Sequence, residues 1–174
     1  MNVMLAENAA RQMILLVEDN PADADLTQVA FETVGTPADI NVLVNGEDAI
    51  NYLSRIGAYH DAVIPQLVLL DLNLPRVGGL EVLAAIKSLQ ATRHIPVVVL
   101  TSSESHDDII KSYRLGANCY LTKPFGLDAY RDMARRLHEF WLELAKLPPS
   151  ADETPGGSGL IQSSDIRQPV RSIR

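Results

Sequence analysis

The chain contains very little cysteine. Cys119 is its one cysteine among 174 residues, which excludes a disulfide within the chain and is typical of a reducing compartment. Hydrophobic residues make up 47%, as in folded globular proteins rather than disordered ones. We therefore expect a globular protein in the cytoplasm.

Excess basic charge and long apolar runs are also missing. Acidic residues outnumber basic ones by 22 to 15, and the net charge of −7 argues against a protein held on nucleic acid by phosphate contacts. No apolar run approaches the roughly 20 residues that cross a bilayer. The first residues, MNVMLAENAARQ, have neither the basic start nor the apolar stretch of a secretion signal. We expect neither a nucleic-acid partner nor a membrane partner.

What the chain does have is a regular alternation of strand-like and helix-like segments. Three short segments are almost wholly apolar, which indicates strands buried on both faces of a parallel sheet. They lie at 13–17, 66–70 and 96–100, and weaker strand candidates lie at 40–44 and 119–122. Because β-α units recur about five times, we predict an α/β fold: a doubly wound parallel sheet with helices on both faces.

Local signals indicate where helices begin. Asn20 can cap a helix and Pro21 suits its first position, so a helix should start directly after the first strand. The Asn45-Gly46 pair turns the chain before a helix predicted over 47–55.

The composition changes after residue 147. Pro148-Pro149 ends a helix predicted over 127–147, and the sequence PGGSG at 155–159 reads as flexible linker. We predict an N-terminal extension at 1–11, one domain at 12–147, and a C-terminal tail at 148–174 that is either linker-like or the arm of a dimer.

Polar residues gather where the predicted strands end. Glu18 and Asp19 follow the first strand, Asp71 follows 66–70, Thr101 follows 96–100, and Lys123 follows 119–122. Ligands bind parallel sheets at the carboxyl ends of their strands, so these side chains should meet at one edge. Three carboxylates, a hydroxyl and an ammonium are therefore expected together.

This combination suits phosphoryl transfer. Three converging carboxylates repel one another unless a cation lies among them, and oxygen ligands favour Mg²⁺. A carboxylate can act as the nucleophile that forms an aspartyl phosphate. The metal and the lysine would neutralise the incoming phosphoryl group, and such chemistry needs mainly positioning and charge stabilisation.

The segments ILLVEDN, LLDLNLPRVGG, VVLTSS and YLTKPF resemble the receiver domain of response regulators, the family of the chemotaxis regulator, over residues 12–147. The resemblance implies a flavodoxin-like (β/α)5 fold with strand order 2-1-3-4-5. It also implies a two-component signalling protein that is phosphorylated by a sensor histidine kinase and is not itself an enzyme beyond its own phosphorylation and dephosphorylation.

The resemblance assigns a role to each acidic residue. Asp71 would be the phosphoacceptor and a Mg²⁺ ligand, Glu18 and Asp19 the acidic metal pair, and the backbone carbonyl of Asn73 the last protein ligand. Glu18 stands where the family more often has Asp. Its extra methylene shifts the carboxylate by about one bond length, so it binds the metal either directly or through water.

The remaining roles concern phosphate binding and switching. By the same resemblance Lys123 binds the phosphoryl group, Thr101 is the switch hydroxyl, Tyr120 changes rotamer on activation, and Lys123-Pro124 is a cis peptide. Two simpler interpretations stay open: Thr101 or Ser105 caps the next helix, and Tyr120 is a static core residue.

A narrower resemblance concerns the partner. The insertion at 57–65, the segment NCYLTKP and the ending EFWLELAKLPP are similar to small response regulators paired with phytochrome histidine kinases. They imply a phytochrome kinase as the phosphoryl donor.

The last predicted helix carries an aromatic pair. Phe140 and Trp141 point about 100° apart, so one faces the sheet while the other faces outward. We expect a homodimer through this helix, and a wide core stripe is the alternative.

Two other functions remain as alternatives. One is a receiver-like scaffold that works without phosphorylation. The other is an aspartate-nucleophile phosphatase, which normally needs a second acid two residues after the nucleophile, where this chain has Asn73. The tail is short and poor in apolar residues, so we expect no output domain and an output through protein contacts.

Overall fold

The computed structural model describes residues 12–148. Its sheet has five parallel strands in the order β2-β1-β3-β4-β5. They are β1 (Gln12–Val17), β2 (Ala38–Leu43), β3 (Leu67–Leu70), β4 (Val97–Thr101) and β5 (Cys119–Thr122). All five predicted strands and their order are confirmed, and the fold is the flavodoxin-like one. The proposed extension 1–11 and nearly all of the tail lie outside the described residues.

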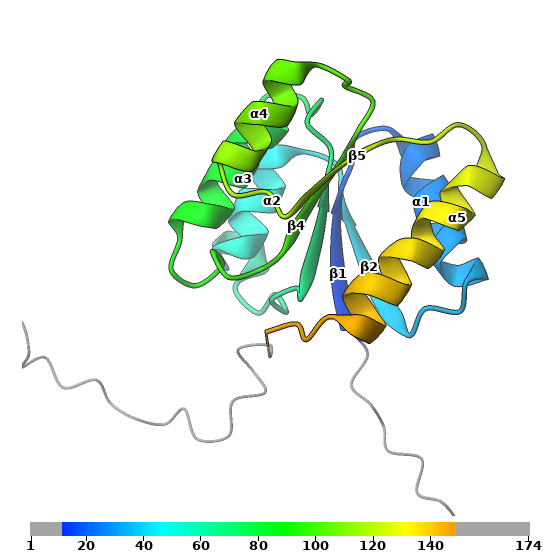
Figure 1. Ribbon diagram of the computed structural model, residues 1–174. Helices are drawn as coiled ribbons and strands as arrows, with labels where there is room; N and C mark the ends of the chain where they lie inside the picture. Colours follow the sequence, from blue (N-terminus) through cyan, green and yellow to red (C-terminus); the bar gives the residue numbers. More distant parts are fainter. Residues whose placement is uncertain (1–11, 149–174) are drawn as a thin grey trace, which may run out of the picture.

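Helices cover both faces of this sheet. They are α1 (Pro21–Thr33), α2 (Gly46–Leu53), α3 (Gly79–Ser88), α4 (His106–Arg114) and α5 (Leu127–Leu137), with short turns η1 (Gly57–Tyr59) and η2 (His138–Leu144). Figure 1 shows α1 and α5 on one face, and α2, α3 and α4 on the other. Within residues 12–148, none of the helices combines the length and the hydrophobicity that crossing a bilayer requires.

Two cores result from this layering. Every residue of β3 is buried, and its side chains alternate between the two faces. Leu67 and Leu69 pack with α1 and α5, whereas Val68 and Leu70 pack with α2 and α3. Because both faces of β3 are buried, all of its residues are apolar, and apolar and polar residues do not alternate along it.

Side-chain caps begin the helices that follow the strands. Asn20 Oδ1 accepts hydrogen bonds from the backbone N–H of Ala22 at 2.9 Å and of Asp23 at 3.4 Å, as the sequence predicts. Asn45 caps α2 in the same way. The cap of α4 is Ser105, whose hydroxyl accepts from the N–H of Asp108 at 3.5 Å, so Thr101 is not the cap.

The helix predicted over 127–147 is shorter and changes character. Regular α-helix ends at Leu137, a wide π-type turn continues to Leu144, and Ala145 is already extended. The N–H of Ala145 donates to the carbonyl of Phe140, five residues earlier, at 2.8 Å, which closes the wide turn. The prediction of one regular α-helix up to residue 147 was therefore wrong at this end.

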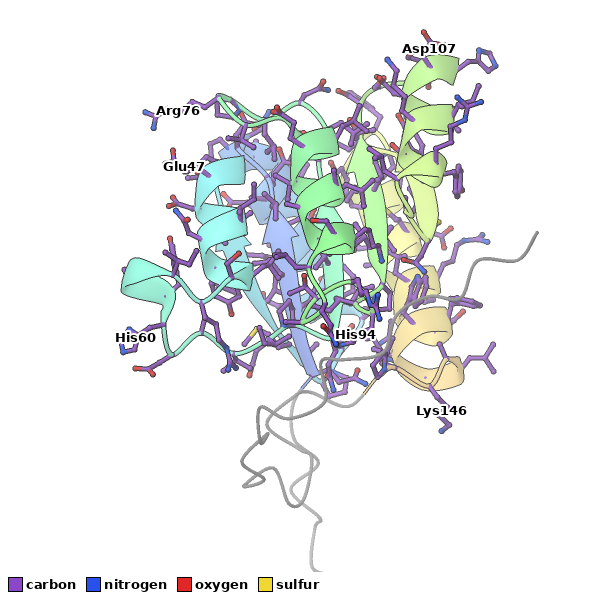
Figure 2. All side chains as sticks on the ribbon, turned by 90° about the vertical axis from the view of Figure 1, so that its left-hand side faces the viewer. Glu47, His60, Arg76, His94, Asp107 and Lys146 are labelled. Carbon is purple, nitrogen blue, oxygen red and sulfur yellow. The ribbon has the colours of Figure 1, made fainter. Side chains whose placement is uncertain are left out.

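The two ends of the sheet differ in what surrounds them. Figure 2 labels Arg76 and Asp107 near the carboxyl ends of the strands, and His94 and Lys146 near the opposite end. Arg76 belongs to the loop after β3, and Asp107 lies in the first turn of α4. The loops at the carboxyl end of the strands therefore carry the candidate site.

Candidate functional site

Three carboxylates meet at the carboxyl end of the sheet. One oxygen from each of Glu18, Asp19 and Asp71 lies within 4.8 Å of the others. Glu18 and Asp71 are buried at 2% and 3% exposure, whereas Asp19 is exposed. The convergence follows from parallel β1 and β3, which are hydrogen-bonded neighbours and end at the same edge. A cluster of oxygen donors with one open side suits a hard divalent cation.

Lys123 lies against the same cluster. Its ammonium is 2.8 Å from Asp71 Oδ2 and 2.6 Å from Glu18 Oε2, and its side chain is only 8% exposed. Burial alone would lower the pKa of Lys123, but hydrogen bonds to these carboxylates and to Asp23 raise its pKa above the usual lysine value. Lys123 is therefore a firmly charged cation at neutral pH.

Glu18 is poorly solvated as an anion. Burial raises the pKa of its carboxyl group, and the hydrogen bonds from Lys123 and from the backbone of Asn20 offset this only in part. Both of its oxygens have a partner, since Oε1 accepts from the Asn20 N–H at 3.1 Å and Oε2 contacts Lys123. A further cation would relieve the cost of this buried charge.

Asp71 is held through both of its oxygens. The N–H of Asn73 donates to Oδ1 at 3.1 Å, and Lys123 donates to Oδ2. The Asn73 amide in turn donates to the hydroxyls of Thr101 at 3.5 Å and Ser102 at 3.3 Å. The loop after β3 is thereby tied to the end of β4.

Close packing also fixes the backbone at Asp71. A side-chain carbon added to Gly79, the first residue of α3, would lie 2.1 Å from the carbonyl oxygen of Asp71. Only glycine allows this approach, so Gly79 lets α3 begin directly behind the candidate phosphoacceptor.

Thr101 and Tyr120 meet on one loop residue. Thr101 is fully buried, and its hydroxyl accepts from the N–H of Ser103 at 3.3 Å. The Tyr120 hydroxyl donates to the carbonyl of the same Ser103 at 2.9 Å. A displacement of the loop after β4 would therefore disturb both side chains, which is the connection that their predicted switching roles need.

The Lys123-Pro124 peptide differs from the expectation. No peptide bond within residues 12–148 is cis, so this one is trans. The trans form is favoured by about 0.5–1 kcal/mol for a peptide before proline. The Lys123 ammonium contacts the acidic cluster from the trans form.

Asp23 is a site residue that the search for strand ends missed. It lies in the first turn of α1, and its Oδ2 is 2.9 Å from Lys123 Nζ. Its Oδ1 lies 3.4 Å from the hydroxyl of Tyr130, whose pKa rises to about 12, chiefly through burial and also because of Asp23. The available signal was the Asn20 cap, which places the third residue of the helix beside the end of β1.

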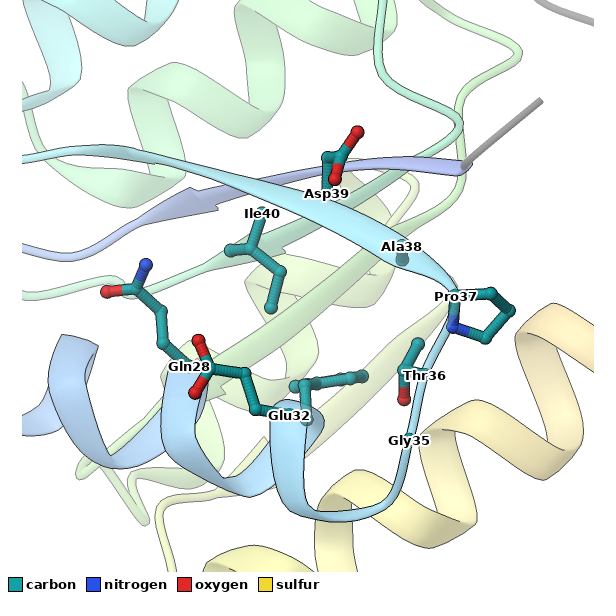
Figure 3. A pocket seen from close by; sticks show the side chains of 9 residues that line it. Gln28, Glu32, Gly35, Thr36, Pro37, Ala38, Asp39 and Ile40 are labelled. Atoms are coloured by element: carbon teal, nitrogen blue, oxygen red, sulfur yellow. The ribbon is translucent and has the colours of Figure 1, made fainter.

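A separate hollow lies away from the acidic cluster. Figure 3 shows it between the end of α1 and the start of β2, where Gln28, Glu32, Thr36 and Ile40 line a space of about 570 Å³. None of the predicted site residues borders it. The site is therefore recognised by its charges and not by its volume.

Comparisons with known proteins agree with this geometry. Residues 14–135 match the model of the family described as the response regulator receiver domain. The chain is 43% identical to response regulator Rcp1 of Synechocystis sp. over 145 residues, which are 83% of this chain and 99% of Rcp1.

Solved structures are similar as well. The phosphorylated cyanobacterial phytochrome response regulator RcpA superposes with a TM-score of 0.77 at 45% identity, covering 80% of this chain and 100% of RcpA. The Mn²⁺-bound form of Rcp1 gives a TM-score of 0.75 at 44% identity, covering 79% of this chain and 99% of Rcp1. With the five parallel strands and the acidic cluster at their carboxyl ends, these likenesses show that the chain belongs to the response regulator receiver domain family.

Proposed function

We propose that Asp71 accepts a phosphoryl group from a sensor histidine kinase in a Mg²⁺-dependent reaction. The main support is the buried Asp71 carboxylate at the end of β3, which accepts hydrogen bonds from the Lys123 ammonium and the Asn73 N–H. Two further acidic residues lie beside it. A carboxylate oxygen of Asp71 attacks phosphorus and forms the new O–P bond. The bond from phosphorus to the kinase histidine nitrogen breaks, and the imidazole keeps the electron pair.

The donor set fits a magnesium ion. Asp19, Asp71 and the backbone carbonyl of Asn73 are the direct ligands in this proposal. Because both oxygens of Glu18 already have partners, Glu18 acts through a water molecule. When bound, the ion neutralises charge on the phosphoryl oxygens and on the acids around them. The Mn²⁺-bound form of Rcp1, 44% identical, supports a divalent metal here.

Lys123 and Thr101 receive the phosphoryl oxygens in this proposal. The ammonium already lies 2.8 Å from Asp71 Oδ2, so a short shift brings it onto the new group. Thr101 donates its hydroxyl to another phosphoryl oxygen and thereby leaves the Ser103 N–H. The movement of Ser103 passes to Tyr120, whose hydroxyl bonds the same residue.

We further propose a phytochrome-type histidine kinase as the partner. RcpA is a phytochrome response regulator, and 45% of its aligned residues are shared. The insertion at 57–65, which forms η1, and the ending EFWLELAKLPP belong to the same resemblance. The protein then works in the cytoplasm without nucleic-acid or membrane contacts.

Output through a homodimer is the last part of the proposal. Phe140 is 52% exposed and Leu144 73% exposed, while Trp141 packs into the core below them. A symmetric partner would bury this apolar surface on both subunits at once. The expected dimer should weaken in Phe140→Asp but not in Ile56→Asp, an equally exposed site beyond α2. Light scattering distinguishes these outcomes, and a monomeric wild type would contradict the dimer.

Acetyl phosphate with Mg²⁺ tests the central proposal. Intact mass spectrometry should find one added phosphoryl group in the wild type and in Asp61→Asn, an exposed control, but none in Asp71→Asn. A wild type that takes up no phosphoryl group would favour the scaffold. Rapid release of phosphate from many unrelated phosphate esters would favour a phosphatase.

A further inference from the structure

Lys123 contacts one carboxylate that does not belong to the acidic cluster. Its ammonium nitrogen lies 2.6 Å from Glu18, 2.8 Å from Asp71 and 2.9 Å from Asp23. The first two carboxylates belong to the group that can hold a metal, whereas Asp23 does not. Asp23 reaches Lys123 from the first turn of α1.

Asp23 is also fixed from a second helix. Its Oδ1 lies 3.4 Å from the hydroxyl of Tyr130 on α5, and Tyr130 is 2% exposed. Asp23 itself is 27% exposed, and the Lys123 side chain is 8% exposed. The carboxylate is therefore oriented by one buried group and directed at another.

The three acids differ in what happens to them during the reaction. A divalent cation and a phosphoryl group would both interact with Glu18 and Asp71. The attraction between these two carboxylates and the Lys123 ammonium would then weaken. Asp23 lies outside that group and contacts Lys123 and Tyr130, so its charge stays with the ammonium.

We propose that Asp23 is a positioning residue, oriented by Tyr130, that holds the Lys123 ammonium beside Asp71 while metal and phosphoryl group occupy the acidic cluster. This inference rests on the proposed function, since it concerns the same phosphoryl transfer.

Two other roles of Asp23 make different predictions. If Asp23 competed with the phosphoryl group for Lys123, its removal would speed the reaction. If it only joined α1 to α5, its removal would lower stability and leave the rate unchanged.

The kinetic test compares variants at saturating Mg²⁺ with acetyl phosphate. Asp23→Asn should lower the phosphorylation rate constant about tenfold, which is the effect of losing one charge-assisted hydrogen bond. Asp23→Glu should recover part of the rate, and Tyr130→Phe should lower it less than Asp23→Asn. The Mg²⁺ dissociation constant, measured by calorimetry, should stay within about twofold of the wild type.

The matched control is Asp25→Asn. Asp25 lies on the same helix with an exposed side chain, and the variant makes the same change of charge. Its rate should equal that of the wild type. A faster Asp23→Asn, or an unchanged one, would overturn the proposal.

A second measurement does not depend on phosphorylation. A lysine ammonium fixed by hydrogen bonds gives a ¹H–¹⁵N correlation in an NMR spectrum because its protons exchange slowly with water. The signal that is missing in Lys123→Met is assigned to Lys123. In the Mg²⁺-loaded protein the signal should persist in the wild type and in Asp25→Asn, and vanish in Asp23→Asn. If the wild type takes up no phosphoryl group, the proposed function fails, and this spectrum still decides the role of Asp23. A signal that survives in Asp23→Asn would overturn the positioning role.

Discussion

Two lysines lie at opposite ends of the sheet, and they have opposite electrostatic surroundings. Lys123, at the carboxyl ends, contacts three carboxylates. Lys87, in the last turn of α3, donates to the backbone carbonyl of Ile95 at 2.7 Å, and also to the Arg93 carbonyl and the Asn118 side chain. These three acceptors are neutral. The pKa of Lys87 is lowered by burial, whereas that of Lys123 is raised by its carboxylates.

The difference separates a structural lysine from a functional one. Neutral oxygens satisfy the Lys87 donors and join α3 to the starts of β4 and β5, because Asn118 also accepts from the Val97 N–H at 2.9 Å. At the other end, Lys123 contacts three carboxylates, and Asp19 adds a further carboxylate beside two of them, Glu18 and Asp71. A surplus of negative charge is costly for folding and useful for binding a cation. An excess of negative charge, and not burial alone, therefore distinguishes the carboxyl end of the sheet, where the candidate site lies.

Removing each lysine should give the largest contrast. Lys123→Met leaves buried carboxylates without their cation, so the unfolding free energy without Mg²⁺ should fall by about 3–5 kcal/mol. Lys87→Met leaves only neutral acceptors unpaired and should cost about 1–3 kcal/mol. Urea denaturation measures both values. Equal losses would break the distinction between the two sites.

Magnesium should sharpen the same contrast. In Lys123→Met the acidic cluster lacks the ammonium that competes with a metal ion for the carboxylates. Mg²⁺ should therefore bind this variant more tightly than it binds the wild type. Added Mg²⁺ should therefore raise the melting temperature of Lys123→Met by more than that of the wild type. Lys87→Met should respond like the wild type. A weaker response of Lys123→Met would mean that the lysine helps to hold the metal.

The pH dependence of Glu18 gives a smaller effect. Its pKa is raised in the folded protein, chiefly by burial, so its contribution favours folding at acidic pH and is lost as the pH rises through the folded pKa. Glu18→Gln should therefore stabilise the metal-free protein at neutral pH and make little difference well below the ordinary glutamate pKa, about pH 3, where Glu18 is protonated in both states. Thermal melts at the two pH values check this. Destabilisation at neutral pH would show that its contact with Lys123 outweighs its burial.

The smallest effect concerns Lys87 at alkaline pH. Because burial lowers its pKa, the unfolded chain binds more protons, and the contribution of Lys87 to stability rises as the pH increases towards the ordinary lysine value. The cost of Lys87→Met should therefore grow slightly over this range. The contribution of Lys123 has the opposite sign and is lost only above the ordinary lysine value. A cost of Lys87→Met that shrinks over the same pH range would contradict this assignment.

Much of this organisation was predictable because it follows from strand ends. Continuous apolar runs located β1, β3 and β4, and parallel strands bring Glu18, Asp19 and Asp71 to one edge whatever the details of packing. Asp23 was not predicted, since it lies in the first turn of a helix and not at the end of a strand. The π-type turn was not predicted either, because its wide backbone bond has no distinct sequence signal.

Peptide mapping after phosphorylation tests the central claim most directly. The wild type is incubated with acetyl phosphate and Mg²⁺, the acyl phosphate is reduced with borohydride, and the modified residue is located by mass spectrometry. We predict a single modified residue, Asp71, and no modification when the metal is removed with a chelator. Modification of Asp19 or Asp23 in place of Asp71, or equal labelling without Mg²⁺, would contradict it.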